Sequence, residues 1–253
     1  MMYDVIQDEP SDNFKRAWQA AARHLGSLGG DGFNWLRANL NPPMAEHLSF
    51  RLGNQIFFVF VEAAEFQYEK ANDLFSQVTQ EANAVPCLMP MTERLTSYEP
   101  SANGWGLIHA EIRESVNPPD LVSSDLIEMT DWELHDFAVQ VVKSQLSEEG
   151  KNVFSTQSSR KIDPSIWYEH EGDTYWVIVR EARYPNNQPA MPPHVADIAN
   201  ELSKIGKAGF FASIVVANHN DSFDPNTKTP GSFLPLYRGH AMSVKYEGLV
   251  SIT

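Results

Sequence analysis

Two stretches of the chain place a short polar turn between apolar runs in the same way. One is "LSFRLGNQIFFVFVEAAEF" at residues 48–66, and the other is "WYEHEGDTYWVIVREARYP" at residues 167–185. Gly-Asn or Gly-Asp between two apolar runs is a signal for a tight β-hairpin. An offset of 119 residues aligns Glu62 with Glu181, and we interpret the two hairpins as related.

An amphipathic helix is expected before each hairpin, because apolar residues recur there at helical spacing. The stripe of the first helix consists of Phe14, Trp18, Ala21 and Leu25. The stripe of the second helix consists of Leu134, Phe137, Val141 and Leu146. Asp131 stands before the second stripe and is expected to cap that helix.

A second helix and two further strands are expected after each hairpin. The helix and first strand fall in residues 71–89 in one half and 195–216 in the other. The order helix, three strands, helix, strand, strand therefore occurs twice along the chain, which indicates a tandem duplication. The predicted fold class is α/β (α+β), with mixed sheets flanked by helices.

The predicted module boundary lies in the segment 115–130, "SVNPPDLVSSDLIEMT", which contains Pro and Ser. This places the first module at residues 1–128 and the second at residues 129–253.

Composition narrows the classes of partner. The formal net charge is −14, which argues against nucleic-acid binding over a broad surface because phosphate contacts require clustered Lys and Arg. No apolar run reaches the ~20 residues of a membrane helix, so no membrane association is expected. Cys87 is the only cysteine, which excludes an internal disulfide and favours a reducing compartment, the cytoplasm. Nothing in the sequence predicts an oligomeric state.

The second hairpin carries acidic and basic groups that could bind a metal ion. Glu181 and Arg183 are two residues apart on a strand, so both side chains should project from one face. A three-residue turn at 171–173 would place Asp163 opposite Glu181, whereas a two-residue turn at 172–173 would place it opposite Ala182. In the first case two carboxylates could hold Mg²⁺, a cation that prefers oxygen ligands.

These residues resemble the PD-(D/E)XK nuclease-like superfamily over residues 131–217, and more weakly over 13–91. The resemblance implies that Asp163 and Glu181 are metal ligands and that Arg183 stands where the family has its catalytic Lys. Mg²⁺ would then be the cofactor; without this site none is expected.

The sequence departs from the family pattern in both halves. Ile162 replaces the Pro that usually precedes the Asp, and Arg is a poor substitute for Lys beside a reacting water. Glu133 lies where some members carry an extra acid. The first copy has Met44 and Ala45 near the Asp position and Ala64 at the Lys position, so it retains only Glu62, the residue aligned above.

Other candidate residues are interpreted as structural. Four histidines lack metal-ligand spacing, namely His135, His194, His219 and His240. The loop 218–232 contains Asp221 and Asp224 but lacks the spacing of an EF-hand. The strand aromatics Trp167, Tyr168, Tyr175 and Trp176 are expected to belong to the sheet core.

Three functions remain open. The first is a binding or regulatory protein without catalytic activity that engages a protein partner. The second is a Mg²⁺-dependent phosphodiesterase or nuclease that uses Asp163, Glu181 and Arg183. The third is a secretion-type chaperone, which rests on architecture alone.

Overall fold

The computed structural model describes residues 11–38, 48–63, 72–95, 97–221, 223 and 233–252. The chain forms two compact units, of which the first ends at Ile127 and the second begins at Glu128. We refer to them as the first and second modules and describe each separately.

The first module contains two full-length helices and seven strands. Its elements are α1 (Asp12–Gly29), β1 (Phe33–Arg37), β2 (Leu48–Leu52), β3 (Gln55–Glu62), α2 (Asn72–Glu81), β4 (Val85–Arg94), β5 (Ser97–Pro100), β6 (Leu107–His109), β7 (Ser115–Val116) and the short α3 (Pro118–Leu121). The sheet order is β1-β2-β3-β4-β6-β7, and β5 pairs with the outer part of β4.

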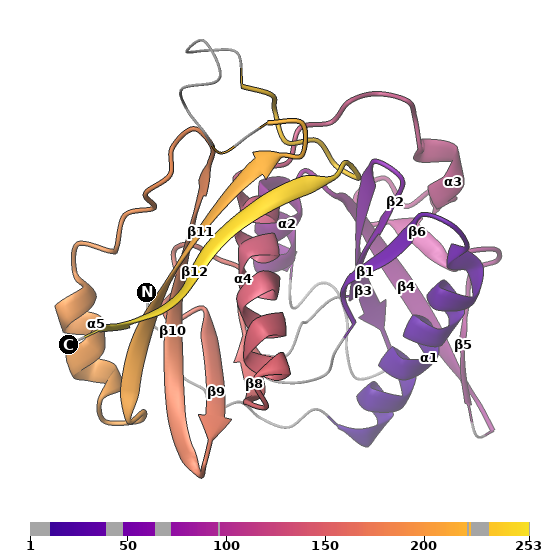
Figure 1. Cartoon of the computed structure of the whole chain (residues 1–253). Coiled ribbons are helices and arrows are strands. Elements are labelled where there is room, and N and C mark those ends of the chain that lie inside the picture. The colour runs from indigo at the N-terminus through magenta and orange to yellow at the C-terminus, as the bar shows by residue number, and fades with distance from the viewer. Residues whose placement is uncertain are drawn as a thin grey trace. The chain divides into compact units, whose positions relative to one another are not determined.

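The second module contains a five-stranded sheet with one helix on each face (Figure 1). Its elements are α4 (Asp131–Glu148), β8 (Asn152–Thr156), β9 (Ile166–His170), β10 (Asp173–Arg183), α5 (Val195–Leu202), β11 (Ala208–Asn218) and β12 (Met242–Ile252). The sheet order is β12-β11-β10-β9-β8.

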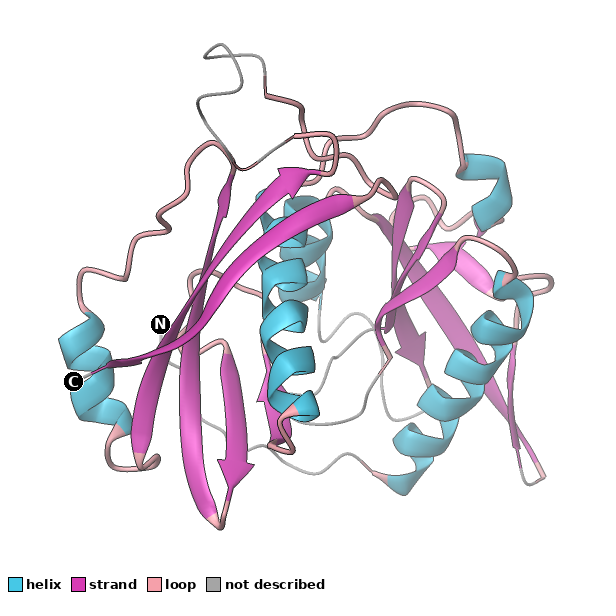
Figure 2. Ribbon diagram, viewed as in Figure 1, coloured by secondary structure: helices cyan, strands magenta, loops and turns pink. Residues whose placement is uncertain are grey.

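Both sheets are mixed and flanked by helices, which confirms the predicted α/β (α+β) fold class (Figure 2), and their main strands pair in the same pattern. In each module the first three strands pair antiparallel, the third and fourth pair parallel, and the last main strand returns antiparallel. The leading helices α1 and α4 each have 18 residues. The second module follows the predicted order of helices and strands, and the first follows it through β4 but then adds β5, β6, β7 and α3 where one strand was predicted.

A β-bulge at an equivalent position strengthens the evidence for duplication. In the first module the register of β1 against β2 shifts between Trp35 and Arg37. In the second module the register of β8 against β9 shifts between Val153 and Ser155. Both residues of each pair are related by an offset of 118, and bulges tend to persist as designed features of a fold.

The hairpin turns also correspond at an offset of 118, and the offset of 119 taken from the sequence is wrong. Leu52 pairs with Gln55 in the first hairpin, and His170 pairs with Asp173 in the second. The second turn therefore consists of Glu171 and Gly172, both with positive φ (54° and 84°). Neither of the turns considered from the sequence forms.

This correction changes the residue equivalences, because a slip of one residue moves every strand side chain to the other face of the sheet. Glu62 corresponds to Arg180, and Ala63 corresponds to Glu181. The shared glutamate inferred from the sequence does not exist in the fold.

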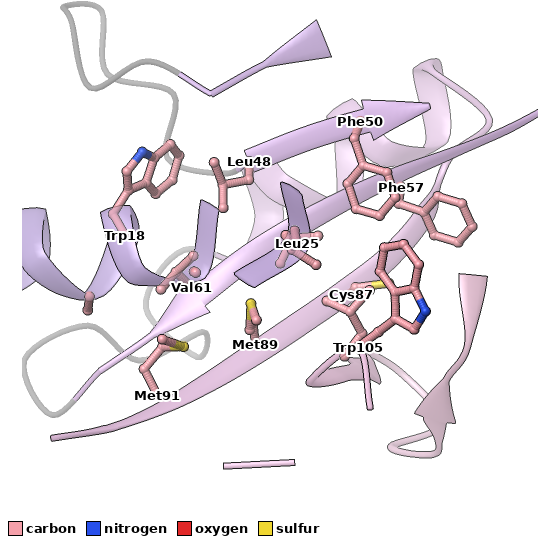
Figure 3. Packing of buried hydrophobic residues seen from close by; sticks show 14 of the residues in the cluster. Trp18, Leu25, Leu48, Phe50, Phe57, Val61, Cys87, Met89, Met91 and Trp105 are labelled. Carbon is pink, nitrogen blue, oxygen red and sulfur yellow. The ribbon is translucent and has the colours of Figure 1, made fainter. Parts of the chain in front are cut away.

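The first module has an apolar core between α1 and its sheet (Figure 3). All four residues of the predicted α1 stripe are buried. They pack against strand residues that include Leu48, Phe50, Phe57, Val61 and Met89. Cys87 lies within this core, and burial raises the pKa of its thiol far above the usual range.

We predict that Cys87 of the native protein reacts with iodoacetamide or a disulfide reagent about 100-fold or more slowly than the same thiol in urea, because the thiolate is the reactive form. Reaction time courses at mildly alkaline pH would measure this. Equal rates in both states would show that the first core opens readily.

The second module has a core on each face of its sheet. Alternate residues of β10 face opposite sides: Val177 and Val179 pack under α4, whereas Trp176 and Ile178 pack under α5. Three of the four strand aromatics are fully buried, and Tyr175 is partly buried, as the sequence predicted.

The N-cap of α4 differs from the prediction, which was Asp131. Thr130 is the N-cap, its side chain accepting from the Glu133 N–H in a capping box.

The α5 side leaves no room for a side chain at Gly209. Gly209 pairs with Trp176, and an added Cβ would lie 2.1 Å from the Trp176 ring. We expect Gly209→Ala to destabilise the second module by about 2–3 kcal/mol through overpacking. Urea unfolding followed by tryptophan fluorescence would measure the loss. Gly26→Ala in α1, where the nearest side-chain atom is 3.9 Å away, is the control and should not destabilise.

Candidate functional site

Two of the predicted site residues, Glu181 and Arg183, lie at the carboxyl end of β10, and the third, Asp163, precedes β9. β10 runs parallel to β11, and the carboxyl ends of parallel strands are a frequent location for binding sites. Arg180 and Glu181 are both buried although they carry charge. Groups of this kind require partners inside the protein.

Glu181 projects toward α4 and is held by two basic side chains. His135 Nδ1 donates to Glu181 Oε2 over 2.6 Å, and both side chains are almost completely buried. Arg160 Nε lies 2.9 Å from the other carboxylate oxygen, and its side chain is 48% exposed. Arg160 therefore reaches from the surface to neutralise Glu181.

His135 uses only one of its ring nitrogens for a hydrogen bond. A carboxylate can only accept, so the Nδ1–H donates to Glu181. Nε2 is buried and has no partner among the residues that the structure describes. The sequence interpreted His135 as a lone structural histidine, but it is the residue that orients Glu181.

Arg183 lies on the same face as Glu181, as the two-residue spacing predicted. Its Nη2 donates to the Met129 carbonyl oxygen over 2.6 Å and lies 3.3 Å from Asp131 Oδ1. Both partners are at the start of α4. The Arg183 guanidinium thus anchors the start of a helix, which is a different role from positioning a water.

Asp163 is paired with Arg180. The guanidinium Nη2 lies 3.0 and 2.8 Å from the two carboxylate oxygens, and Nη1 donates to the Val179 carbonyl oxygen. Continuing the β9–β10 register beyond Ile166 brings residue 163 level with residue 180. The sequence considered Glu181 and Ala182 as the opposite residue, and both expectations are wrong.

The two proposed metal ligands therefore face away from each other. Consecutive strand residues project from opposite faces, so Arg180 and its partner Asp163 lie on the α5 side while Glu181 lies on the α4 side. Within the ranges that the structure describes, no group of three or more His, Cys, Asp and Glu side chains is placed to hold a metal ion.

Two further buried acids belong to the same region. Glu133 receives Arg238 Nε at 2.9 Å and Nη2 at 2.8 Å, in addition to closing the helix cap. Arg238 reaches α4 because Met129 N–H donates to the Leu236 carbonyl oxygen. Asp136 accepts from the Ser158 hydroxyl. Glu133, which the resemblance suggested as an extra acid, therefore pairs with Arg238 and caps α4.

The cluster of Glu133, Asp136, Asp163 and Glu181 with their partners is here called the buried charge cluster. Its basic members Arg160 and Arg180 were not identified from the sequence, and Arg238 was noted only as a residue that could face the hairpin. Arg180 adjoins Glu181, but its role depends on the hairpin register. Arg160 and Arg238 lie in irregular segments, where no periodicity relates them to α4.

The remaining candidates do not converge on a site. His194 precedes α5, His219 lies 3.5 Å from the Ser243 hydroxyl, and His240 contacts the Tyr237 ring. Asp221 accepts from the Leu234 N–H. The remaining loop and first-copy positions Met44, Ala45, Ala64 and Asp224 lie outside the described residues.

The first module has no counterpart of Glu181. Ala63, at the equivalent position, is buried in the apolar core under α1. Glu62 follows Val61 on the strand and so points away from α1. The buried charge cluster is thus a property of the second module.

The fold and this cluster define a duplicated mixed α/β protein whose second half carries internally paired acids. Residues 132–252 match the model of a family described as a domain of unknown function (DUF8840). The match covers most of the second module. No curated protein and no solved structure matches the chain. None of the described helices combines the length and apolarity needed to cross a membrane.

We expect Asp163→Asn to destabilise the second module by about 3–5 kcal/mol, because it leaves the buried Arg180 charge without a counterion. The double variant Asp163→Asn/Arg180→Met should recover part of this loss. Chemical unfolding would measure both.

Asp131→Asn is the matched control, since the Asp131 side chain is 77% exposed and its pair with Arg183 should contribute under about 1 kcal/mol. A similarly small loss for Asp163→Asn would contradict the assigned burial.

Proposed function

We propose that the chain is a binding or regulatory protein without catalytic activity, built on a duplicated nuclease-like scaffold and engaging a protein partner. The observation that carries this proposal is the buried Asp163–Arg180 pair, in which Arg180 Nη2 contacts both carboxylate oxygens on the opposite sheet face from Glu181. A hydrolytic Mg²⁺ site needs its carboxylates to converge on one cation. Here each carboxylate is satisfied by protein groups.

The arginines make conversion into a metal site costly. Freeing Asp163 would leave Arg180 buried without a counterion, and freeing Glu181 requires Arg160 to leave. Arg183, at the position of the family lysine, is bonded to the start of α4. Both carboxylates are therefore engaged by arginines, and Arg183 Nη2 is engaged by the start of α4.

Charge favours a protein over a nucleic acid as the partner. The chain has 33 acidic and 19 basic residues, and the buried charge cluster occupies four of the acids and three of the arginines, which leaves the excess of acids nearly unchanged. The remaining surface is dominated by acidic groups, which repel phosphates and attract basic protein surfaces. The single buried Cys87 is consistent with activity in a reducing compartment such as the cytoplasm.

Metal titration combined with nuclease assays tests the absence of catalysis. We expect calorimetry with Mg²⁺ and Mn²⁺ to give no saturable binding, and supercoiled and single-stranded DNA to stay intact. The variant Glu181→Gln should behave as the parent does. DNA cleavage by the parent that is lost in Glu181→Gln, yet retained in the exposed control Glu169→Gln on β9, would establish the enzyme instead.

Capture on immobilised protein from a nuclease-treated native lysate tests the partner class. We expect one protein in stoichiometric amount, released by about 0.5 M NaCl because salt screens exposed charges. In a parallel capture from untreated lysate, recovery of nucleic acid without a protein would contradict a protein partner.

A further inference from the structure

A groove with a volume of about 540 Å³ lies along one flank of α4. It is lined by Phe137, Gln140, Val141, Ser144, Gln145, Glu148 and Glu149. The α4 positions among these recur every three or four residues, so they form one stripe beside the buried stripe of the helix. Phe137 and Val141 pack against the core of the second module but are only partly buried. The volume is within the range of pockets that bind ligands.

The corresponding flank of α1 is covered by the strand β5. An offset of 121 residues aligns the buried stripes of α1 and α4, and it differs from the strand offset of 118 because the connection to the next strand is shorter in the second module. Arg16, at the position of Phe137, contacts Glu93 Oε1 over 3.0 Å and lies 5.5 Å from the centre of the Tyr98 ring. Tyr98 belongs to β5 and packs against the first core. In the first module, therefore, an aromatic side chain covers this flank.

The first half of β12 corresponds to β5 but leaves the flank of α4 open. Both strands pair antiparallel with the outer part of a neighbour, β5 with β4 and β12 with β11. The ladders make Glu93 equivalent to Val216, so Val244 stands where β5 has Tyr98. Val244 is 36% exposed, and its partner Val216 belongs to the core under α4. The second module thus has a small side chain where the first has an aromatic ring.

The chemistry of the groove favours an aromatic side chain accompanied by a basic one. Phe137 and Val141 offer apolar surface to a ring. Lys151 pairs with Glu149 over 2.5 Å, whereas Glu148 adds a second, exposed negative charge. Both acids lie at the carboxyl end of α4, where the helix dipole also favours a cation.

We propose that this groove binds an extended segment of the protein partner, with one aromatic side chain between Phe137 and Val141 and a Lys or Arg beside Glu148. The inference rests on the proposed function, which supplies the protein partner. Val141 and Glu148 are seven residues apart, which is about 10 Å along a helix axis. An extended chain covers this distance in about three residues, so the aromatic and basic residues of the segment should be separated by that number.

Peptide selection on the full chain tests the groove. The probe is a phage library of random peptides of about 12 residues. We expect the enriched peptides to combine Phe, Tyr or Trp with a Lys or Arg about three residues away. By fluorescence anisotropy of synthetic copies, Ser144→Trp should weaken binding about tenfold or more because it fills the groove, and Glu148→Lys about threefold or more because it repels the cation. Both residues are exposed, so neither change should unfold the module.

Ser147→Trp and Glu201→Lys are the matched controls, because both residues are exposed and neither lines the groove. Both variants should bind the peptides as the parent does. Three results would each overturn the proposal. No peptide could be enriched, the enriched peptides could bind Ser144→Trp as tightly as the parent, or the parent could form a dimer that Ser144→Trp dissociates, which would assign the groove to a second copy.

Capture from lysate separates this inference from the proposed function. If Ser144→Trp captures the same protein in the same amount as the parent, the groove is not the binding site, although the proposed function holds. If the parent cleaves DNA through Glu181, the proposed function fails, and peptides that lose affinity for Ser144→Trp would still establish the groove.

Discussion

The burial of β10 on both faces is the constraint on which the second module depends. A strand covered by α4 on one side and α5 on the other cannot turn any side chain toward water along its central part. Its alternation decides which core each residue enters, and a charged residue at its end needs a partner on its own side. Arg180 meets Asp163 on the α5 side, and Glu181 meets His135 and Arg160 on the α4 side.

The two modules differ in the side chains that fill the space between the leading helix and the sheet. They share topology, the length of the leading helix and the position of a bulge, yet the first fills the space under α1 with apolar side chains while the second places charged pairs under α4. Buried ion pairs are weak contributors to stability and are commonly replaceable by apolar residues. Their concentration in the half that matches a protein family makes this half the preferred place to look for function.

A residue that matches a nuclease-like motif in sequence need not be free to bind a cation or a substrate. Asp163, Glu181 and Arg183 suggested such a motif in the sequence, but each contacts a neighbour from another part of the second module. The carboxylate of Asp163 already accepts from the Arg180 guanidinium on both oxygens, so binding a cation there would place two positive charges on one buried acid. The same side chains that suggested catalysis therefore serve to hold α4, β10 and the preceding loop together.

The sequence by itself determined the elements and their repetition, because apolar periodicity and turn residues are local signals. It predicted the α1 stripe, the two hairpins, the sheet aromatics and the shared face of Glu181 and Arg183. The pairing of Asp163 with Arg180 depended on a one-residue choice of turn, and Glu171 at positive φ carries no local signal strong enough to make that choice. The contacts of Arg160 and Arg238 join residues distant in the chain, so only the tertiary structure could decide them.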